Sequence, residues 1–353
     1  MTSIRPFGPI GWILNKLPQI KQWSVLGTIA TEDRCLAAAQ AVFRSRLASD
    51  ITLLKILDPV SPTIRFRKEV ESRLTKRERD ANAEFGSTLS IHEMELLCVE
   101  QEIGDFASDF LQRCGDNVIV DLSTMPKRFF FPVLTRLLQS SRIVNLIATY
   151  SLPERYAKVL EEDPDEWSSL PMYGGDPLIE TRTTPASLII GVGYQPLKII
   201  EILDHVRFDA DHVKLLFPFP SIPPGFVENW KFVARIKSEW SKLRGAELPS
   251  DAIIRVPIRD ASIAFDQLIA HTNDGRASSV VLAPFGPKPI SLAMCLLGIA
   301  RRAEGIATEI GYTQPHFYHP EYSSGVATRD GVPAVTAYCL RLGGRDLFSL
   351  PPE

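Results

Sequence analysis

The chain has 353 residues, of which 45% are hydrophobic and 23% are charged. These proportions are typical of globular domains, so they exclude wholesale disorder and a collagen-like chain. The 39 Lys and Arg against 42 Asp and Glu give a formal net charge of −3, which disfavours a protein that coats nucleic acid along an extended track. At roughly 100–200 residues per domain, the length predicts two domains or one large one.

The cysteines and the apolar segments bear on the cellular compartment. The five cysteines are widely spaced and form no C-x-x-C pair, so we expect neither a disulfide scaffold nor a zinc ribbon. Gly and Pro interrupt the apolar patch at 7–14, which argues against a signal peptide. The longest apolar run, 290–300, is too short to span a bilayer. We therefore expect a soluble cytoplasmic protein without a membrane partner.

Strand and helix patterns alternate along the first half of the chain. A helix starting at Ser90, with Glu93 in capping-box spacing, is predicted to carry an apolar face through Phe110, and residues 88–91 are either a short strand or the start of this helix. The other predicted elements are strands at 23–28, 51–57, 117–122 and 143–150 and helices at 32–47, 63–85 and 126–138. This alternation predicts a parallel sheet with helices on both faces.

The pattern restarts after an interruption. Residues 161–176 are acidic and rich in Pro and Gly, which indicates a solvated linker rather than a metal site. The elements predicted next are strands at 187–192, 212–219, 253–256, 279–283 and 308–312, with helices at 196–204, 227–243, 262–271 and 290–302. A last strand at 334–342 is expected to extend the sheet of this second half or to cap its edge.

The two halves share landmarks at a nearly constant offset. Gly27 and Gly191 are 164 positions apart, Tyr150 and Tyr312 are 162 apart, and the Pro-Lys pair at 126 recurs 161 positions later. We therefore predict an α/β fold with two tandem Rossmann-like units, doubly wound and mainly parallel, from an internal duplication. The expected boundaries are 1–160 with an N-terminal extension, a linker at 161–184, and 185–353 with a C-terminal strand. The alternative is that any two doubly wound domains look alike at this level.

Candidate binding residues follow the predicted strands, because ligands of open parallel sheets bind at the carboxyl ends of the strands. In each half a strand is followed by a tight turn, a Lys and a helix, an arrangement that suits a phosphate or another anion. These two turns supply Asp121, Ser123, Thr124 and Lys127, and Gly286, Lys288 and Ser291. The alternative for both turns is an ordinary strand-to-helix turn with a surface lysine. Neither is a Walker A motif, and no G-x-G-x-x-G is present.

Other predicted loops add polar and aromatic side chains. Aromatic rings can stack on a base, while Ser, His and Glu can bind its edges. The residues we assign to ligand binding from these loops are Asp33, Arg34, Tyr150, Tyr194, Gln195, Tyr312, Tyr318, Tyr322 and Ser323. The alternatives are helix-start carboxylates beside a counter-charge for the first of these loops and a self-packed surface loop for the last.

No nucleophile and base can be paired from the sequence, because no serine lies in G-x-S-x-G. If the protein is an enzyme, His316, His319 and Glu321 are the candidate acid and base groups. The two histidines form H-x-x-H, but flanking prolines argue against a helix and therefore against a metal site. We expect neither a metal nor a cofactor.

The segment Phe285-Gly286-Pro287-Lys288-Pro289-Ile290-Ser291-Leu292-Ala293 resembles the strand–turn–helix segment of CARF-type domains, which are Rossmann-like sensors of cyclic oligonucleotides in prokaryotic antiviral systems. Gly286, Lys288, Ser291 and Ala293 fit the family pattern, whereas Pro287 replaces its Thr. Asp121-Leu122-Ser123 with Lys127 resembles it more loosely.

The resemblance implies a nucleotide-binding sensor or regulatory protein in antiviral defence. CARF-type domains usually pair as homodimers around the ligand, and we infer that a tandem duplication could build such a pair within one chain. Because we find no nuclease motif, the partners expected are a small anionic ligand and an effector protein. Two alternatives stay open: an enzyme acting on a nucleotide or phosphoester, and an interaction subunit that docks a partner through the charged helix at 65–80.

Overall fold

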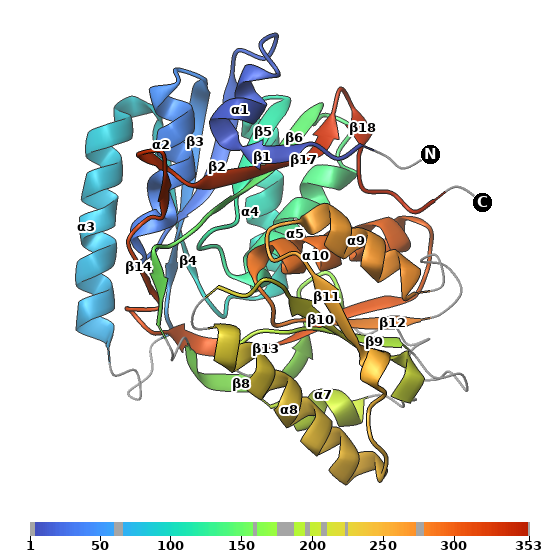
Figure 1. The fold of residues 1–353 in the computed structure, drawn as a ribbon. Coiled ribbons are helices and arrows are strands. Elements are labelled where there is room, and N and C mark those ends of the chain that lie inside the picture. Colours follow the sequence, from blue (N-terminus) through green and yellow to red (C-terminus); the bar gives the residue numbers. More distant parts are fainter. Residues whose placement is uncertain are drawn as a thin grey trace. The chain divides into compact units, whose positions relative to one another are not determined.

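The computed structural model describes residues 4–59, 66–157, 161–174, 187–194, 198–205, 210–222, 225–272 and 279–351. The chain forms two compact units, one comprising Met1–Asp163 with Pro315–Leu347 and the other Pro164–Gln314 with Phe348–Glu353. Both are mixed α/β structures in which strands alternate with helices and the sheets are mainly parallel, as predicted (Figure 1).

The sheet of the first unit contains β1 (Phe7–Pro9), β2 (Trp23–Ile29), β3 (Ala48–Leu57), β4 (Leu89–Glu95), β5 (Asn117–Asp121), β6 (Asn145–Ser151) and β17 (Val335–Leu342). The order across the sheet is β1-β17-β6-β5-β2-β3-β4. From β6 to β4 all neighbours are parallel, whereas β17 is antiparallel to both β6 and β1. Every residue of β2 is buried, as expected for a central strand that is covered on both faces.

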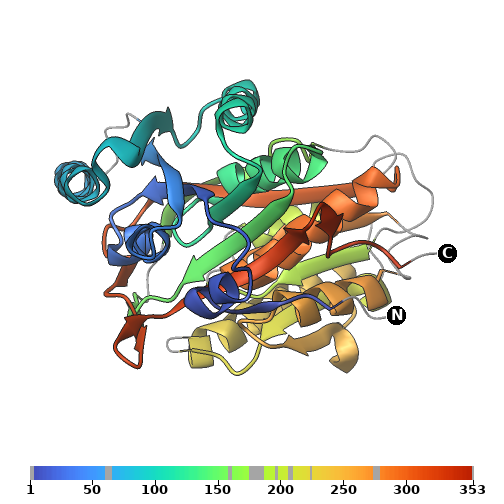
Figure 2. The same cartoon turned by 90° about the horizontal axis from the view of Figure 1, so that it is seen from above.

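The helices of this unit are α1 (Ile10–Asn15), α2 (Ala37–Arg44), α3 (Arg67–Phe85), α4 (Glu100–Arg113) and α5 (Lys127–Gln139). An ion pair of 2.8 Å between Arg44 and Glu84 joins α2 to α3. The helices α4 and α5 pack together on the other face of the sheet (Figure 2). The sheet is therefore doubly wound, and its strand-to-helix loops lie at one edge.

Two expectations about this sheet were wrong. The predicted helix begins at Glu100 rather than Ser90, because residues 89–95 form β4, which pairs in parallel with β3 over its whole length. The last strand, expected in the second unit, is β17 of the first sheet, where it pairs with β6. In both places hydrogen bonds to a sequence-distant strand decide the structure, and local patterns do not contain that information.

The sheet of the second unit contains β8 (Glu161–Ser169), β9 (Ser187–Gly191), β10 (Val213–Pro218), β11 (Ile253–Val256), β12 (Val280–Pro284) and β13 (Thr308–Tyr318), in the order β11-β10-β9-β12-β13-β8. Its helices are α7 (Ile199–His205), α8 (Gly225–Arg244), α9 (Ala261–Ala270) and α10 (Lys288–Ala303). The pairs α7 with α8 and α9 with α10 cover opposite faces (Figure 1). The expected linker is wrong in its first part, because residues 161–169 form β8 beside β13; residues 175–184 lie outside the described residues.

The parallel strands follow one pattern in both sheets. The order β6-β5-β2-β3-β4 in the first matches β13-β12-β9-β10-β11 in the second, with each strand in the same place along its half of the chain. Two doubly wound units reach this arrangement with or without common ancestry, so the duplication stays a prediction. Within the described part of the chain, no helix is long and apolar enough to cross a membrane.

Candidate functional site at the carboxyl edge of the first sheet

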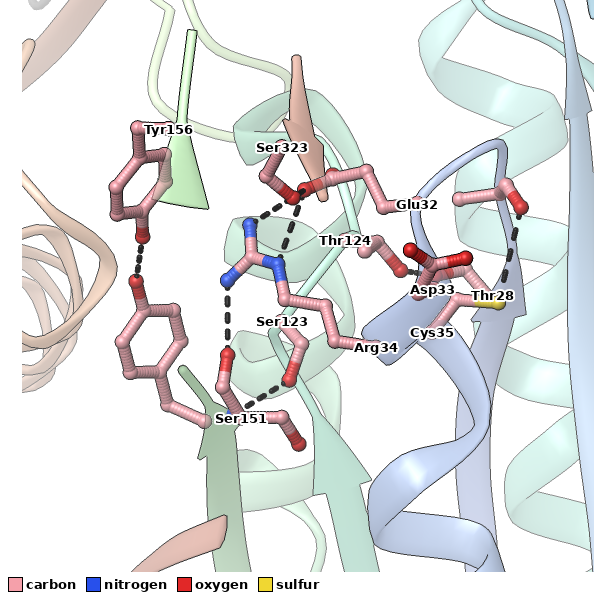
Figure 3. Close-up of polar contacts among 12 residues, drawn as sticks. Thr28, Glu32, Asp33, Arg34, Cys35, Ser123, Thr124, Ser151, Tyr156 and Ser323 are labelled. Atoms are coloured by element: carbon pink, nitrogen blue, oxygen red, sulfur yellow. Dashed lines mark hydrogen bonds and ion pairs between the residues drawn. The ribbon is translucent and has the colours of Figure 1, made fainter. Parts of the chain in front are cut away.

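The strand order of the first sheet reverses between β2 and β5, since the chain adds β3 and β4 on one side and β6 on the other. The loops that leave β2 and β5 therefore begin side by side at the carboxyl edge. A hydrogen bond of 2.5 Å between the hydroxyls of Thr28 and Thr124 joins them (Figure 3). Such a reversal point is where open α/β sheets bind their ligands.

Arg34 lies at the centre of the polar cluster beside this point, in the short 3₁₀ helix η1 (Asp33–Leu36) after β2 (Figure 3). Its side chain is only 2% exposed. Nε and Nη2 donate to Oε2 of Glu32 at 2.9 and 2.8 Å, and Nη1 donates to the carbonyl oxygen of Ser151 at 2.9 Å. Arg34 thus ties the loop after β2 to the last residue of β6.

Two tyrosine rings enclose the Arg34 guanidinium. Its Cζ lies 5.4 Å from the ring centre of Tyr150 and 5.6 Å from that of Tyr156, within cation–π range, and the two phenol hydroxyls share a hydrogen bond. Burial alone would lower the pKa of Arg34, but the charge of Glu32 and the surrounding groups raise it well above its ordinary value. Burial also raises the pKa of Tyr156. The cluster therefore keeps the Arg34 cation beside a neutral Tyr156 phenol.

The segment near the C-terminus completes this cluster. The Ser323 hydroxyl donates to Oε2 of Glu32, and β14 (Ser323–Ser324) pairs with β7 (Arg155–Tyr156). The amide of Gly325 donates to Oδ2 of Asp33 at 2.7 Å. Gly325 has a φ of +67°, and a Cβ there would meet Glu154 at 2.6 Å, so this close approach requires glycine.

The placement of this segment corrects the sequence analysis, which assigned Tyr318, Tyr322 and Ser323 to the second unit. All three lie in the first unit, where the ring of Tyr322 packs edge-on against Tyr156 at 6.3 Å and against Tyr318 at 5.9 Å. The chain passes from β13 of the second sheet into the first unit at Pro315, so only Tyr312 of the four stays in the second unit.

Asp121, the last residue of β5, is buried behind the loop. Its Oδ1 accepts hydrogen bonds from the amide and the hydroxyl of Ser123, at 3.2 and 2.5 Å, and from the Thr149 hydroxyl at 3.0 Å. The Ser123 hydroxyl in turn accepts from the amide of Ser151 at 2.7 Å. Burial raises the pKa of Asp121 to about 6 although these hydrogen bonds oppose the shift. Asp121 and Ser123 therefore set the shape of the loop.

The helix α5 begins directly after this loop. Pro126 precedes it and provides no side-chain cap, and the first turn, all of it described, carries no acidic residue. Lys127 is the first helical residue and is 9% exposed. Nearby, the buried hydroxyl of Ser151 has no hydrogen-bond partner among the residues that the structure describes. The edge thus combines backbone donors, a lysine and an unsatisfied buried hydroxyl.

At the equivalent edge of the second unit, the loops after β9 and β12 pack closely against each other through backbone atoms. A Cβ on Gly193 would lie 2.3 Å from the carbonyl oxygen of Phe285, and one on Gly191 would lie 3.2 Å from the amide nitrogen of Gly286. Ser291 is fully buried, with its hydroxyl directed to the Gly286 and Pro284 carbonyls at 3.2 and 3.4 Å. The structure therefore gives Gly286 and Ser291 packing roles.

Three predicted residues of the second unit remain. Lys288 begins α10 and is half-buried, and Tyr194 is half-buried with its ring 3.0 Å from the position of a Cβ on Gly225. Gln195 lies outside the described residues. In the part of the chain that the structure describes, the first edge gathers several predicted side chains into one polar cluster.

The close approach of Gly193 to the Phe285 carbonyl predicts that Gly193→Ala destabilises the second unit by about 1–3 kcal/mol. Backbone atoms must move to accept the methyl group. Gly11→Ala is the matched control. Gly11 lies in α1 with open space around it, so this change should stabilise the first unit by about 0.5–1 kcal/mol. Urea unfolding followed by hydrogen exchange of each unit measures both effects. Equal effects of the two substitutions would contradict the described packing.

The candidate acid and base groups occupy a turn near α3. The Nδ1 of His319 accepts from the amide of Glu321 at 3.1 Å, and its ring packs on Phe66 at 4.6 Å. The Glu321 carboxylate lies 3.7 Å from Arg73, whose guanidinium also donates to the Pro320 carbonyl at 2.8 Å. His316 lies in β13, half-buried. These contacts order a turn, and no described contact joins His319 to the Arg34 cluster.

The remaining predictions concern the charged helix α3, the cysteines and metal binding. Arg77 of α3 forms an ion pair with Asp33, so part of the charge of this helix is used inside the first unit. All five cysteines are described and buried, and none forms a disulfide. Among the described residues, no group of three or more His, Cys, Asp or Glu is placed to hold a metal ion.

Residues of the site that were missing from the predicted set include Thr28, Glu32, Ser151 and Tyr156. The sequence holds a signal for Glu32, a carboxylate two positions before Arg34. It holds none for Ser151, whose contribution is a backbone carbonyl and an unpaired hydroxyl at a strand end.

Comparisons with known proteins do not assign the chain to a family. No protein-family model matches the chain, and no curated protein matches it significantly. Among solved structures, it is similar to a protein assigned as a universal stress protein from Pseudomonas aeruginosa UCBPP-PA14, with 13% identity over 86% of this chain and 96% of that chain and a TM-score of 0.24. It is also similar to the tryptophan synthase alpha chain from Legionella pneumophila, with 13% identity, coverage of 82% and 94%, and a TM-score of 0.19. At such TM-scores neither similarity carries an inference about function.

Proposed function

We propose that the first unit binds a small anionic ligand of nucleotide type at the edge between β2 and β5, and that the protein acts as a sensor or regulatory protein. The observation that carries this proposal is the uncapped start of α5 at the reversal point of the sheet, with Lys127 as its first residue. The buried Ser151 hydroxyl, without a partner among the described residues, is an independent polar group at the same edge.

Each group has a role in this proposal. The start of α5 and the Lys127 ammonium would hold a phosphate, because a helix start directs N–H donors and partial positive charge toward an anion. The hydroxyls of Thr28 and Thr124 share one hydrogen bond and would reorient toward a ligand oxygen. Arg34 would act on the ligand through its electrostatic field and not by direct contact. Its guanidinium is held by Glu32 and Ser151, so its positive charge stays in a fixed position.

A regulatory role fits the surroundings of this edge better than catalysis does. Among the titratable groups beside it, Arg34, Glu32 and Asp121 are held by hydrogen bonds within the unit, and His319 is used in a turn. The segment from Ser323 to Gly325 contacts the same loop, so a ligand that shifts the loop would shift this segment too. The resemblance to CARF-type domains makes cyclic oligonucleotides the first ligands to test and prokaryotic antiviral defence the proposed setting.

Isothermal titration of the full chain with inorganic phosphate, mononucleotides, linear dinucleotides and cyclic oligoadenylates tests the proposal. We expect at least one nucleotide to bind. Lys127→Met, which keeps the aliphatic packing, should weaken that binding about tenfold or more, as should Thr124→Val. Lys76→Ala, on the exposed surface of α3, is the control and should leave it unchanged.

Two outcomes would overturn the proposal. One is that no ligand of the panel binds to the wild-type chain. The other is that Lys127→Met and Thr124→Val both bind as tightly as wild type. A thermal unfolding curve of each variant separates a lost site from a lost fold.

A further inference from the structure

The second unit carries a group of exposed aromatic side chains at the carboxyl edge of its sheet, and this group is independent of the site proposed above. Phe219 directly follows β10 and is 54% exposed, while Phe226 and Trp230 in the first turns of α8 are 59% and 46% exposed. Large aromatic side chains are mostly buried in folded proteins, so a group of exposed rings beside a sheet edge indicates a binding surface.

Two of these rings, those of Trp230 and Phe219, have packing partners. The Trp230 ring packs at 4.5 Å on that of Phe217, which is buried in β10. The guanidinium of Arg255, on the neighbouring strand β11, lies 5.5 Å above the Phe219 ring. Phe217 and Arg255 are paired in the register of the two strands. The surface thus presents rigid aromatic faces next to a planar cation, which costs little conformational entropy on binding.

Basic residues continue the exposed stripe of α8 beyond the rings. Residues 226, 227, 230, 231, 234, 235, 238 and 242 are exposed and share one side of the helix, since they are three or four positions apart. Among them Lys231, Arg235 and Lys242 carry charge, and the helix as a whole has five basic against two acidic residues. Glu228 and Glu239 form ion pairs with these three cations at 3.0–3.1 Å, and because two carboxylates face three cations the group keeps a net charge of +1.

We propose that this surface, formed by Phe219, Phe226, Trp230, Arg255 and the basic stripe of α8, binds a short single-stranded nucleic acid. Bases would stack on Phe219 and Trp230, because every base offers a flat face to an aromatic ring and such stacking tolerates any sequence. Phosphates would meet Arg255, Lys231 and Arg235.

The charges favour nucleic acid over a lipid surface. A membrane-binding helix needs a continuous apolar face, whereas in α8 the exposed large apolar residues of the first turns are separated from Leu243 in the last turn by a basic stretch. The guanidinium over the Phe219 ring is the arrangement that extends a stack of bases. Anionic vesicles therefore serve as the competing ligand in the test.

Fluorescence anisotropy with labelled single-stranded oligonucleotides of about ten nucleotides, poly-U and poly-dT, tests this inference on the full chain. We expect binding that weakens as salt is raised. Phe219→Ala and Trp230→Ala should each weaken binding about fivefold or more, and Arg255→Gln should also weaken it. Trp12→Ala removes an equally exposed tryptophan in the first unit and should have no effect.

Three outcomes would overturn the inference: absence of binding by the wild-type chain, equal binding by Phe219→Ala and Trp230→Ala, or binding to phosphatidylserine vesicles without binding to oligonucleotides. Lys127→Met should bind these oligonucleotides as wild type does. Failure of the site in the first unit can thus be told from failure of this one.

Discussion

Arg34→Leu should lower the free energy of unfolding of the first unit by about 3–5 kcal/mol, because it leaves the Glu32 carboxylate buried without its counter-charge. The side chains of Arg34 and Glu32 are 2% and 11% exposed, and the pair shares two hydrogen bonds of 2.8 and 2.9 Å. The Ser151 carbonyl also loses its donor. Urea unfolding, followed by hydrogen exchange in peptides that cover β2 and β6, measures the change for this unit alone.

Two further variants make that result specific. Arg44→Leu breaks an ion pair in which the arginine side chain is 61% exposed, so it should change the stability by less than about 1 kcal/mol. The double variant Glu32→Leu with Arg34→Leu should be more stable than Arg34→Leu alone, because no unpaired charge remains. An Arg34→Leu protein within 1 kcal/mol of wild type would contradict the description of this cluster.

Asp121→Asn should change how the stability of the first unit depends on pH. Burial raises the pKa of Asp121 to about 6 in the folded protein, against about 3.9 in an unfolded chain. A raised pKa means that the carboxyl contributes fully below pH 4 and that this contribution is lost as the pH rises through 6. Two pKa units correspond to about 3 kcal/mol.

The asparagine keeps an oxygen that can accept from Ser123 and Thr149 but does not ionise. Relative to wild type, Asp121→Asn should therefore gain about 2–3 kcal/mol between pH 4 and pH 8. Urea unfolding curves of both proteins at several pH values measure this difference. A difference that stays constant across the range would show that Asp121 titrates as an exposed carboxyl does.

The central strands could be predicted because their residues alone determine them. Residues 23–29 and 118–121 are buried at successive positions and contain apolar runs such as Val118-Ile119-Val120, which a strand covered on both faces accommodates. The edge elements could not be predicted in this way. β4, β8 and β17 have weaker or misleading local patterns, and pairing with distant strands decides their place.

The same contrast between local sequence patterns and long-range contacts applies to the site. Arg34, Asp121, Ser123 and Lys127 were found because they follow strands in the sequence, and strand ends meet at one edge of a parallel sheet. The bond from Ser323 to Glu32 joins residues 291 positions apart, and the sequence placed Ser323 in the other unit. Near Lys288, Gly193 and Gly286 bring two loops together in close backbone contact, which the local sequence pattern does not indicate.

The central claim is that a nucleotide binds at the carboxyl edge between β2 and β5. Hydrogen exchange of the full chain, with and without the tightest-binding nucleotide of the titration panel, tests it most directly. The claim predicts slower exchange in peptides that cover residues 28–36 and 122–130, with unchanged exchange at 286–292. Protection confined to the second unit, or no protection at a saturating nucleotide concentration, would contradict it.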